Sequence, residues 1–135
     1  MSTQIHNYIN GTLRPPRAGK YIDNVDPSTG QVYGTIADSD NDDLNDAVAA
    51  AQNAFPAWRD AAPTTRAVAL NKLADLIEAR LHDFAMAESR DNGKPLSLCL
   101  AMDIPRAVAN LRAFADAALS FGGAESSNDR SESVI

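Results

Sequence analysis

The chain has a single cysteine, Cys99, and a cysteine thiolate is among the strongest nucleophiles available to an enzyme. Its neighbours are apolar, because residues 96–100 read LSLCL. Apolar surroundings raise the pKa of a thiol and leave little reactive thiolate at neutral pH. We therefore interpret Cys99 as a small buried hydrophobic residue, and the sequence predicts no catalytic residue.

Metal and phosphate chemistry both lack a strong pattern. His6 and His82 have no further histidine or cysteine at metal-ligand spacing, so both are predicted to be solvated. The glycines form neither the dinucleotide-binding nor the Walker pattern. Lys94 follows a helical segment, whose C-terminal end attracts cations rather than phosphate, and a capping role is predicted for it. No cofactor-binding residue is predicted.

The composition is that of one acidic globular domain. With 135 residues, 44% hydrophobic content and a formal charge of −6, the chain can form a core but offers no basic face to nucleic acid or an anionic membrane. Residues 1–6 lack the basic and apolar regions of a signal peptide, and no apolar run could span a bilayer. One cysteine cannot form an internal disulfide. We expect a cytoplasmic protein without nucleic-acid or membrane partners.

Short strands are predicted in the first part of the chain. Asn10 and Gly11 favour a tight hairpin turn between residues 5–9 and a return strand at 12–13. Two further strands are predicted at 21–25 and 31–37. Between them, the sequence DPSTG has the early proline and late glycine of a turn.

From residue 40 the apolar residues recur every three or four positions, which is typical of amphipathic helices. The first helix is predicted to begin after Asp40, a good N-cap, and to end or bend at Pro56. A second, continuous helix is predicted from about Thr64 to the Asn-Gly stop at 92–93. A third is predicted from Asp103 to the glycine pair at 122–123.

The last segment has a different composition. Residues 125–135 are rich in serine and charged side chains and are predicted to be disordered. The predicted fold class is therefore mixed α/β, with short N-terminal strands followed by three amphipathic helices. The predicted division is a domain at 1–124 and a tail at 125–135.

Four segments of the chain form a recognisable series: VDPSTG at 25–30, FPAWR at 55–59, ESRDNGKP at 88–95 and MDIPR at 102–106. Together they resemble the opening part of the aldehyde dehydrogenase superfamily. Their order and spacing carry the resemblance, which covers residues 5–122 and is nearest to the branch that oxidises 2-hydroxymuconic and 2-aminomuconic semialdehydes. It implies an incomplete part of the family's NAD-binding domain, and NAD as the cofactor of the parent enzyme. In the family an aldehyde is oxidised as a cysteine adduct, hydride passes to NAD, and the thioester is hydrolysed.

The resemblance implies a possible monovalent-cation site. In many members the acid of the DNGKP motif, here Asp91, helps to hold the cation together with a backbone carbonyl before the DPSTG motif. The matching positions in this chain are Asn24 and Val25. Carboxylate and carbonyl oxygens are suitable ligands for a hard cation. The alternative is a helix-terminal Asp91 that bonds to nearby backbone.

The resemblance also places Arg106 on a helix that lines the substrate tunnel. A guanidinium there can bind the carboxylate of a muconate-derived semialdehyde through two parallel hydrogen bonds. Asn110, one helical turn on, is predicted to assist. A plain surface arginine is the alternative.

The family's catalytic cysteine, general base and dinucleotide-binding units all lie further along the chain than these segments, and the family pattern is predicted to stop after Gly123. We therefore expect a truncated N-terminal portion of an NAD(P)-dependent dehydrogenase that is inactive alone. Its expected partner is the remaining part of the dehydrogenase or a homo-oligomer of the full-length parent. The alternative is a non-catalytic interaction module that packs on a full-length aldehyde dehydrogenase.

Overall fold

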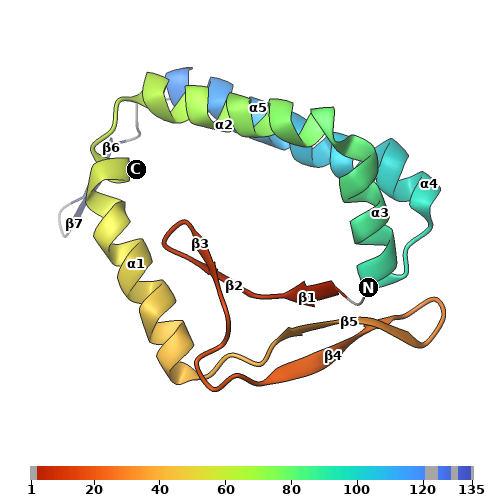
Figure 1. Cartoon of the computed structure of the whole chain (residues 1–135). Coiled ribbons are helices and arrows are strands. Elements are labelled where there is room, and N and C mark those ends of the chain that lie inside the picture. The colour runs from red at the N-terminus through yellow and green to blue at the C-terminus, as the bar shows by residue number, and fades with distance from the viewer. Residues whose placement is uncertain (1–2, 121–124, 129–130, 135) are drawn as a thin grey trace.

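The computed structural model describes residues 3–120, 125–128 and 131–134. A small β layer lies at one side of the molecule, and the helices continue from it as a frame (Figure 1). The predicted fold class, short strands followed by amphipathic helices, is confirmed. No helix of the described segments is long and apolar enough to cross a membrane.

Three strands form the main sheet. β1 (Thr3–Ile5) pairs in parallel with β5 (Gln31–Ala37), and β4 (Tyr21–Asp26) pairs with the other edge of β5 in antiparallel fashion. β2 (Asn7–Ile9) and β3 (Thr12–Arg14) form a separate antiparallel hairpin. Its turn residues, Asn10 and Gly11, both have positive φ, which confirms the turn predicted there.

The first helix, α1 (Asn41–Arg59), begins as predicted. The Asp40 carboxylate accepts hydrogen bonds from the backbone N–H groups of Asp42 and Asp43, and the Asp43 carboxylate accepts from the Asp40 N–H in return. Pro56 does not end the helix. Its carbonyl still accepts a hydrogen bond from the Asp60 N–H, so one more turn follows the proline.

The predicted second helix is two helices, α2 (Pro63–Ala79) and α3 (Leu81–Asn92), separated at Arg80. Arg80 leaves the helical conformation, with φ −120° and ψ 27°, and its N–H bonds to the Ile77 carbonyl three residues back. The apolar stripe continues through this break, but its two halves have different partners: α2 packs along α5, while α3 turns towards the strands (Figure 1). The prediction of one continuous helix was wrong for that reason.

The predicted third helix begins earlier than Asp103. A short helix α4 (Leu96–Leu98) leads into a π-helical turn, η1 (Cys99–Asp103), and then into α5 (Ile104–Ser120). The Pro95 carbonyl accepts from the N–H groups of Leu98 and Cys99, which starts the helical hydrogen bonding at once after the proline. The sequence did not predict α4 and η1, because Pro95 was interpreted only as a residue that prevents the preceding helix from continuing.

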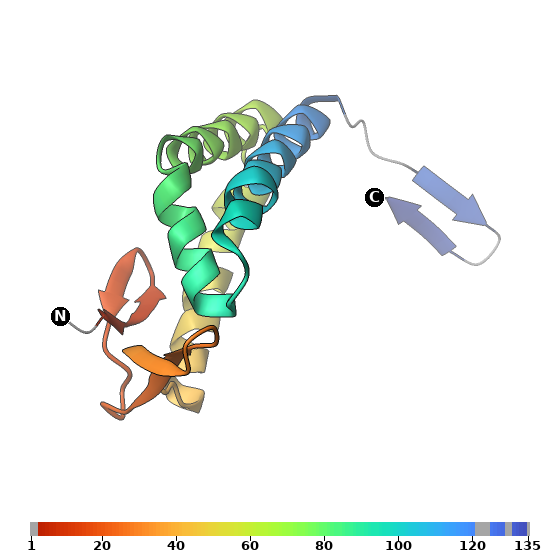
Figure 2. The same cartoon turned by 90° about the vertical axis from the view of Figure 1, so that its right-hand side faces the viewer.

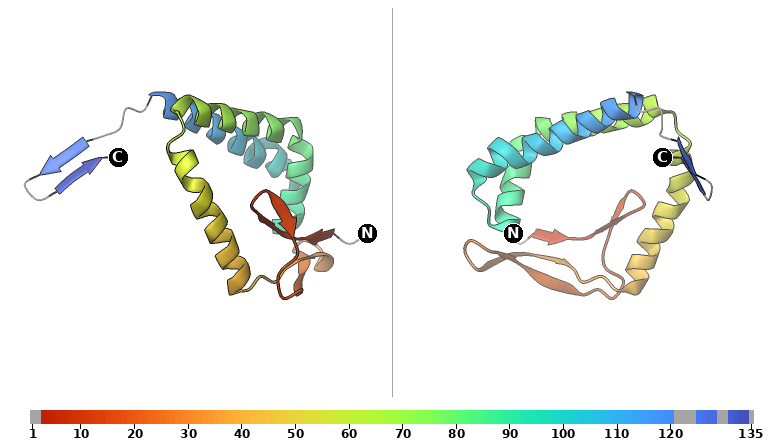
Figure 3. Two further views of the ribbon diagram at one scale, coloured as in Figure 1. Left: turned by 60° about the vertical axis from the view of Figure 1, so that its left-hand side comes forward. Right: turned by 180° about the vertical axis from the view of Figure 1, so that it is seen from behind.

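The best-packed part of the molecule is the contact between α2 and α5, which run side by side in opposite directions (Figure 3). Ala67 and Ala74 of α2 and Val108 and Ala115 of α5 are buried there. Because these side chains are small, the two helices can approach each other closely. At its rim, Arg112 donates to Asp75 at 2.9 Å and to Glu78 at 2.6 Å.

The described part of the C-terminal segment forms two paired strands. β6 (Glu125–Asn128) pairs with β7 (Ser131–Val134) in antiparallel fashion, and the hairpin lies away from the helices (Figure 2). Disorder was predicted for residues 125–135 from their composition. Strand pairing uses backbone groups, so a polar composition does not prevent it. The boundary at residue 124 stays a prediction.

The end of α3 touches the turn between β4 and β5. Gly93 closes α3 with a φ of 75°, as the predicted stop requires, and a Cβ at this position would lie 3.2 Å from the Cβ of Pro27. Gly30, in the turn itself, has a φ of 70° but open space around it.

Substitution of Gly93 by alanine is therefore expected to cost more than the same substitution of Gly30. Gly30→Ala should lower the free energy of unfolding by about 1 kcal/mol, because an L-residue is strained at positive φ. Gly93→Ala should cost about 1 kcal/mol more, because the helix end must also move from Pro27. Denaturant unfolding of both variants measures the difference. Equal losses would show that the contact with Pro27 is unimportant.

An ion pair joins the end of α3 to the π-helical turn. Lys94 Nζ lies 2.6 Å from Asp103 Oδ2, and the two side chains are 38% and 24% exposed. The hydrogen bond from Lys94 holds the pKa of Asp103 below its ordinary value of 3.8. Since the folded pKa lies below the unfolded one, the pair stabilises the fold above pH 3.8 and loses this contribution as the pH falls through the folded pKa.

Lys94→Met is expected to lower the unfolding midpoint near neutral pH. The difference in midpoint between the variant and the unaltered protein should become smaller as the pH falls below 3.8. Thermal unfolding across that pH range is the measurement. Lys72→Met, an exposed lysine on α2, is the matched control and should show no such narrowing. A midpoint difference for Lys94→Met that stays constant with pH would contradict a stabilising ion pair between Lys94 and Asp103.

Candidate functional site

Asp91 lies near the end of α3, where its carboxylate meets two side chains from the strands. Asp91 Oδ1 accepts a hydrogen bond from the Tyr33 hydroxyl at 2.8 Å and another from Asn24 Nδ2 at 3.2 Å. Asn24 Nδ2 also donates to the Tyr33 hydroxyl oxygen at 2.8 Å. The structure thus brings the side chain of Asn24 to Asp91, whereas the resemblance implies a backbone carbonyl at Asn24 or Val25 as the ligand.

A β-bulge brings Tyr33 into this network. Asn24 is paired with Gly34 and Val25 with Val32, so Tyr33 is one extra residue in β5 between these pairs. A bulge redirects the side chain of the extra residue, and here the hydroxyl of Tyr33 reaches across to α3. The sequence alternation in residues 31–37 predicted the strand but carried no signal for the bulge.

Arg90 adds a positive charge to the same corner. Its guanidinium carbon lies 4.3 Å from the centroid of the Tyr33 ring, at cation–π distance. Burial, followed by the hydrogen bond to Asp91, raises the pKa of the Tyr33 hydroxyl, while Arg90 works against that rise. The pKa of Asp26 is lowered, chiefly by hydrogen bonds from Ser28 and to a smaller degree by the charge of Arg90.

The donors at Asp91 can be compared with what a monovalent cation would need. A hard cation takes oxygen ligands, whereas Asn24 turns its NH₂ group towards Asp91. That orientation follows from the partner, because an ionised carboxylate only accepts. Within the described segments no group of three His, Cys, Asp or Glu residues could hold a metal ion. These two side-chain donors meet Asp91 Oδ1, while the cation site with Asp91 and the backbone carbonyls of Asn24 and Val25 stays a prediction.

Arg106 and Asn110, the predicted substrate-binding pair, lie one turn apart on α5 and are both exposed. At about 100° per residue they fall on the side of the helix opposite Val108, which packs against α2. Among the described residues Arg106 forms no ion pair, whereas Arg112 pairs with Asp75 and Glu78. The guanidinium of Arg106 is therefore available to a carboxylate from outside this segment.

Cys99 is completely buried, as the apolar run around it predicts. Burial, the largest effect, raises the pKa of its thiol, and the nearby carboxylate of Asp103 adds to the rise. Both effects leave the thiol protonated at neutral pH and remove it from consideration as a nucleophile.

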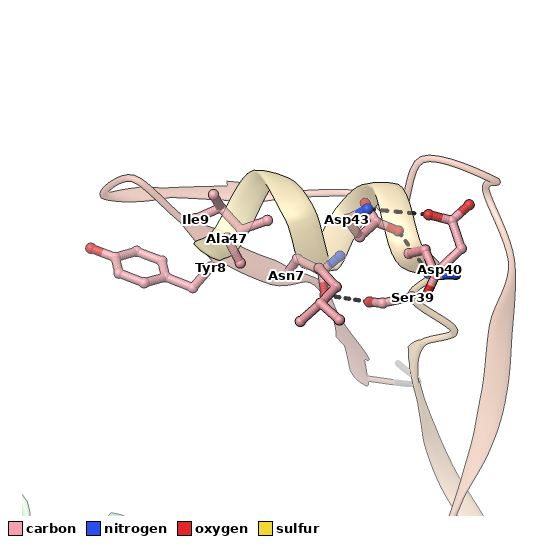
Figure 4. Close-up of a pocket in the computed structure, with 9 residues that line it drawn as sticks. Asn7, Tyr8, Ile9, Ser39, Asp40, Asp43 and Ala47 are labelled. Carbon is pink, nitrogen blue, oxygen red and sulfur yellow. Dashed lines mark hydrogen bonds between the residues drawn. The ribbon is translucent and has the colours of Figure 1, made fainter. Parts of the chain in front are cut away.

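A pocket of about 460 Å³ lies between β2 and the start of α1 (Figure 4). Both acids of the pocket already have hydrogen-bond partners: Asp40 and Asp43 cap α1, and the two carboxylate oxygens of Asp43 share the backbone N–H of Arg17. Asn7 accepts from the Ser39 hydroxyl, while its buried Nδ2 has no acceptor in the described part of the chain. The pocket therefore offers one amide donor and apolar surface but no free acid or base.

One histidine departs from its prediction. His6 Nδ1 shares a hydrogen bond of 2.8 Å with the Tyr21 hydroxyl, and the two rings meet edge to face. His6 is therefore half-buried and structural instead of solvated, while His82 is exposed as predicted.

Known proteins match this chain along most of its length. The family model described as the aldehyde dehydrogenase family matches residues 14–135, so the family pattern continues beyond Gly123, where it was predicted to stop. The 2-aminomuconic semialdehyde dehydrogenases of Homo sapiens and Danio rerio are 47% and 49% identical over 115 residues, which are 85% of this chain and 23% of each relative. The predicted resemblance to that branch is confirmed.

A solved structure gives the same result. PnpE in complex with nicotinamide adenine dinucleotide superimposes with a TM-score of 0.86 and 36% sequence identity, over 95% of this chain and 26% of PnpE. The chain thus spans about a quarter of the length of the relatives that it matches. The family model covers well over half of the chain, and its fold agrees with the structure. The chain belongs to the aldehyde dehydrogenase family.

Proposed function

We propose that this chain is the N-terminal portion of an NAD-dependent dehydrogenase that oxidises a carboxylated semialdehyde, of the 2-hydroxymuconic or 2-aminomuconic type, to the acid. The observation that carries the proposal is the 47–49% identity to two 2-aminomuconic semialdehyde dehydrogenases. NAD is proposed because PnpE, a structural relative, was solved with that dinucleotide. The chemistry belongs to the whole protein, and this segment supplies part of its framework and one side of its substrate site.

Arg106 is proposed to bind the carboxylate of the substrate. Its guanidinium is exposed on α5 and has no acidic partner among the described residues. The lowered pKa of Asp103 comes chiefly from Lys94 and only in small part from Arg106, so Asp103 does not occupy this guanidinium. A planar guanidinium matches a carboxylate with two parallel hydrogen bonds. Asn110, one turn away, presents an amide that can donate to the same carboxylate.

The remaining part of the dehydrogenase is the proposed partner of this segment. Large apolar side chains are exposed on its helices and strands although few are buried, which is typical of a surface that another part of a protein covers. A separate interaction module that packs on a full-length aldehyde dehydrogenase would have the same surface. The two functions differ in activity, because only the first places Arg106 next to a reacting substrate. The most exposed of these side chains are Tyr8, Leu13, Leu44, Val68 and Phe114.

Arg106→Gln, measured in the whole dehydrogenase that carries this segment, is expected to lower kcat/KM for a carboxylated semialdehyde roughly 10- to 100-fold, because a charged hydrogen-bonding partner is lost. The value for a neutral aldehyde of similar length should stay the same. NAD reduction with each substrate is the measurement. Arg106→Lys should recover part of the loss, since it keeps the charge without the planar fork.

Arg112→Gln is the matched control for that experiment. It removes a guanidinium from the same helix, but one that holds α2 through Asp75 and Glu78. It should lower stability without changing the preference between the two substrates. Equal effects of Arg106→Gln on both substrates would remove Arg106 from the substrate site.

The 135-residue chain by itself is expected to oxidise no semialdehyde and to bind a hydrophobic dye strongly. Its one thiol is buried with a raised pKa, and its exposed apolar side chains offer surface to the dye. NAD reduction and dye fluorescence are the two measurements. Turnover of a semialdehyde by the purified chain would overturn this expectation.

A further inference from the structure

We propose that the donor groups of Asn24 and Tyr33 take the place of a monovalent cation at the Asp91 carboxylate, so that this corner of the enzyme closes without a bound metal ion. The inference is independent of the substrate proposed above. It uses only family membership and the contacts at the end of α3.

First, one oxygen of the Asp91 carboxylate already has hydrogen-bond donors. Tyr33 Oη and Asn24 Nδ2 both donate to the same atom, Asp91 Oδ1, at 2.8 Å and 3.2 Å. A cation on this oxygen would have to sit beside two hydrogen atoms that carry positive partial charge. The hydrogen bond between Asn24 and Tyr33 joins the two donors to each other, so a cation would have to displace a connected network.

The second step is the rigidity of the backbone that positions these donors. The bulge places Tyr33 between two ladder pairs, and Gly93 lies so close to the turn that a Cβ there would be 3.2 Å from the Cβ of Pro27. Within that turn, the N–H groups of Thr29 and Gly30 both bond to the Asp26 carbonyl. The side chains of the strands therefore lie at hydrogen-bonding distance from the end of α3.

The third step is charge. The Arg90 guanidinium lies over the Tyr33 ring and lowers the pKa of Asp26, so one positive charge already belongs to this corner. A second cation beside Asp91 would be close to Arg90, and like charges repel. Arg90 thus adds positive charge to this corner, while Tyr33 and Asn24 donate the hydrogen bonds to Asp91.

The experiment compares thermal unfolding of the whole protein that carries this segment in NaCl, KCl and tetramethylammonium chloride at equal ionic strength. The large organic cation cannot enter a site made for a bare ion. The unaltered protein is expected to have the same Tm in all three salts. Tyr33→Phe keeps the ring over Arg90 but removes the donor, and it should have a lower Tm in tetramethylammonium that Na⁺ or K⁺ raises by about 2–4 °C.

Tyr21→Phe is the matched control. It removes a hydroxyl from β4 that bonds to His6, so it should lower Tm equally in all three salts. Asn24→Asp is the second variant, and it repeats the same comparison of Tm in the three salts if Tyr33→Phe does not fold. It exchanges the NH₂ donor for an oxygen of nearly the same shape, and two facing carboxylates should need a cation even more.

A Tm of the unaltered protein that rises in Na⁺ or K⁺ relative to tetramethylammonium would overturn the proposal, because an ion would then bind beside the donors. Cation independence of both Tyr33→Phe and Asn24→Asp would overturn it as well, since there would be no cation position for the donors to fill. Neither result depends on which aldehyde the enzyme oxidises, so both are separate from the test of Arg106.

Discussion

The arrangement of the helices relative to the strands depends on one junction, where the end of α3 meets the β4–β5 turn. The chain leaves the strands through α1 and returns to them only after α2 and α3 have crossed the molecule (Figure 1). At the return, Asp91 accepts from Asn24 and Tyr33, and Gly93 lies against Pro27. Without this junction the strands would be joined to the helices chiefly through α1, so the angle between the β layer and the α2–α5 pair would be poorly fixed.

Local signals in the sequence predicted many elements correctly. Asn10 and Gly11 form their turn, Asp40 caps α1, and Gly93 stops α3 in a left-handed conformation. Each of these depends on the conformational preference of one or two residues and on hydrogen bonds to near neighbours. The apolar period of three and four positions predicted the helical regions, because a helix that packs on one face repeats its apolar residues at that spacing.

Other features depend on partners far away in the sequence and could not be predicted from it. The break at Arg80 follows from α2 and α3 having different partners, although the apolar stripe is continuous through it. The bulge at Tyr33 aims a hydroxyl at a carboxylate 58 residues further on. The resemblance to a family led to Asp91 and Asn24, but it gave no sign of Tyr33 or Arg90. At the position where it implied an ion site, the structure has hydrogen bonds from Asn24 and Tyr33 to Asp91.

The two charged positions named from the family, Asp91 and Arg106, therefore differ in an instructive way. Asp91 has its donors within the segment, so its charge is used to hold the fold together. Arg106 has its charge on a helix fixed by the contact with α2, while Arg112 on that helix is already paired. A guanidinium on a rigid element loses little further backbone freedom when it binds a ligand. The carboxylate of Asp91 already has its donors, Tyr33 and Asn24, whereas Arg106 has no acidic partner among the described residues. We therefore place the proposed substrate carboxylate at α5 and not at the end of α3.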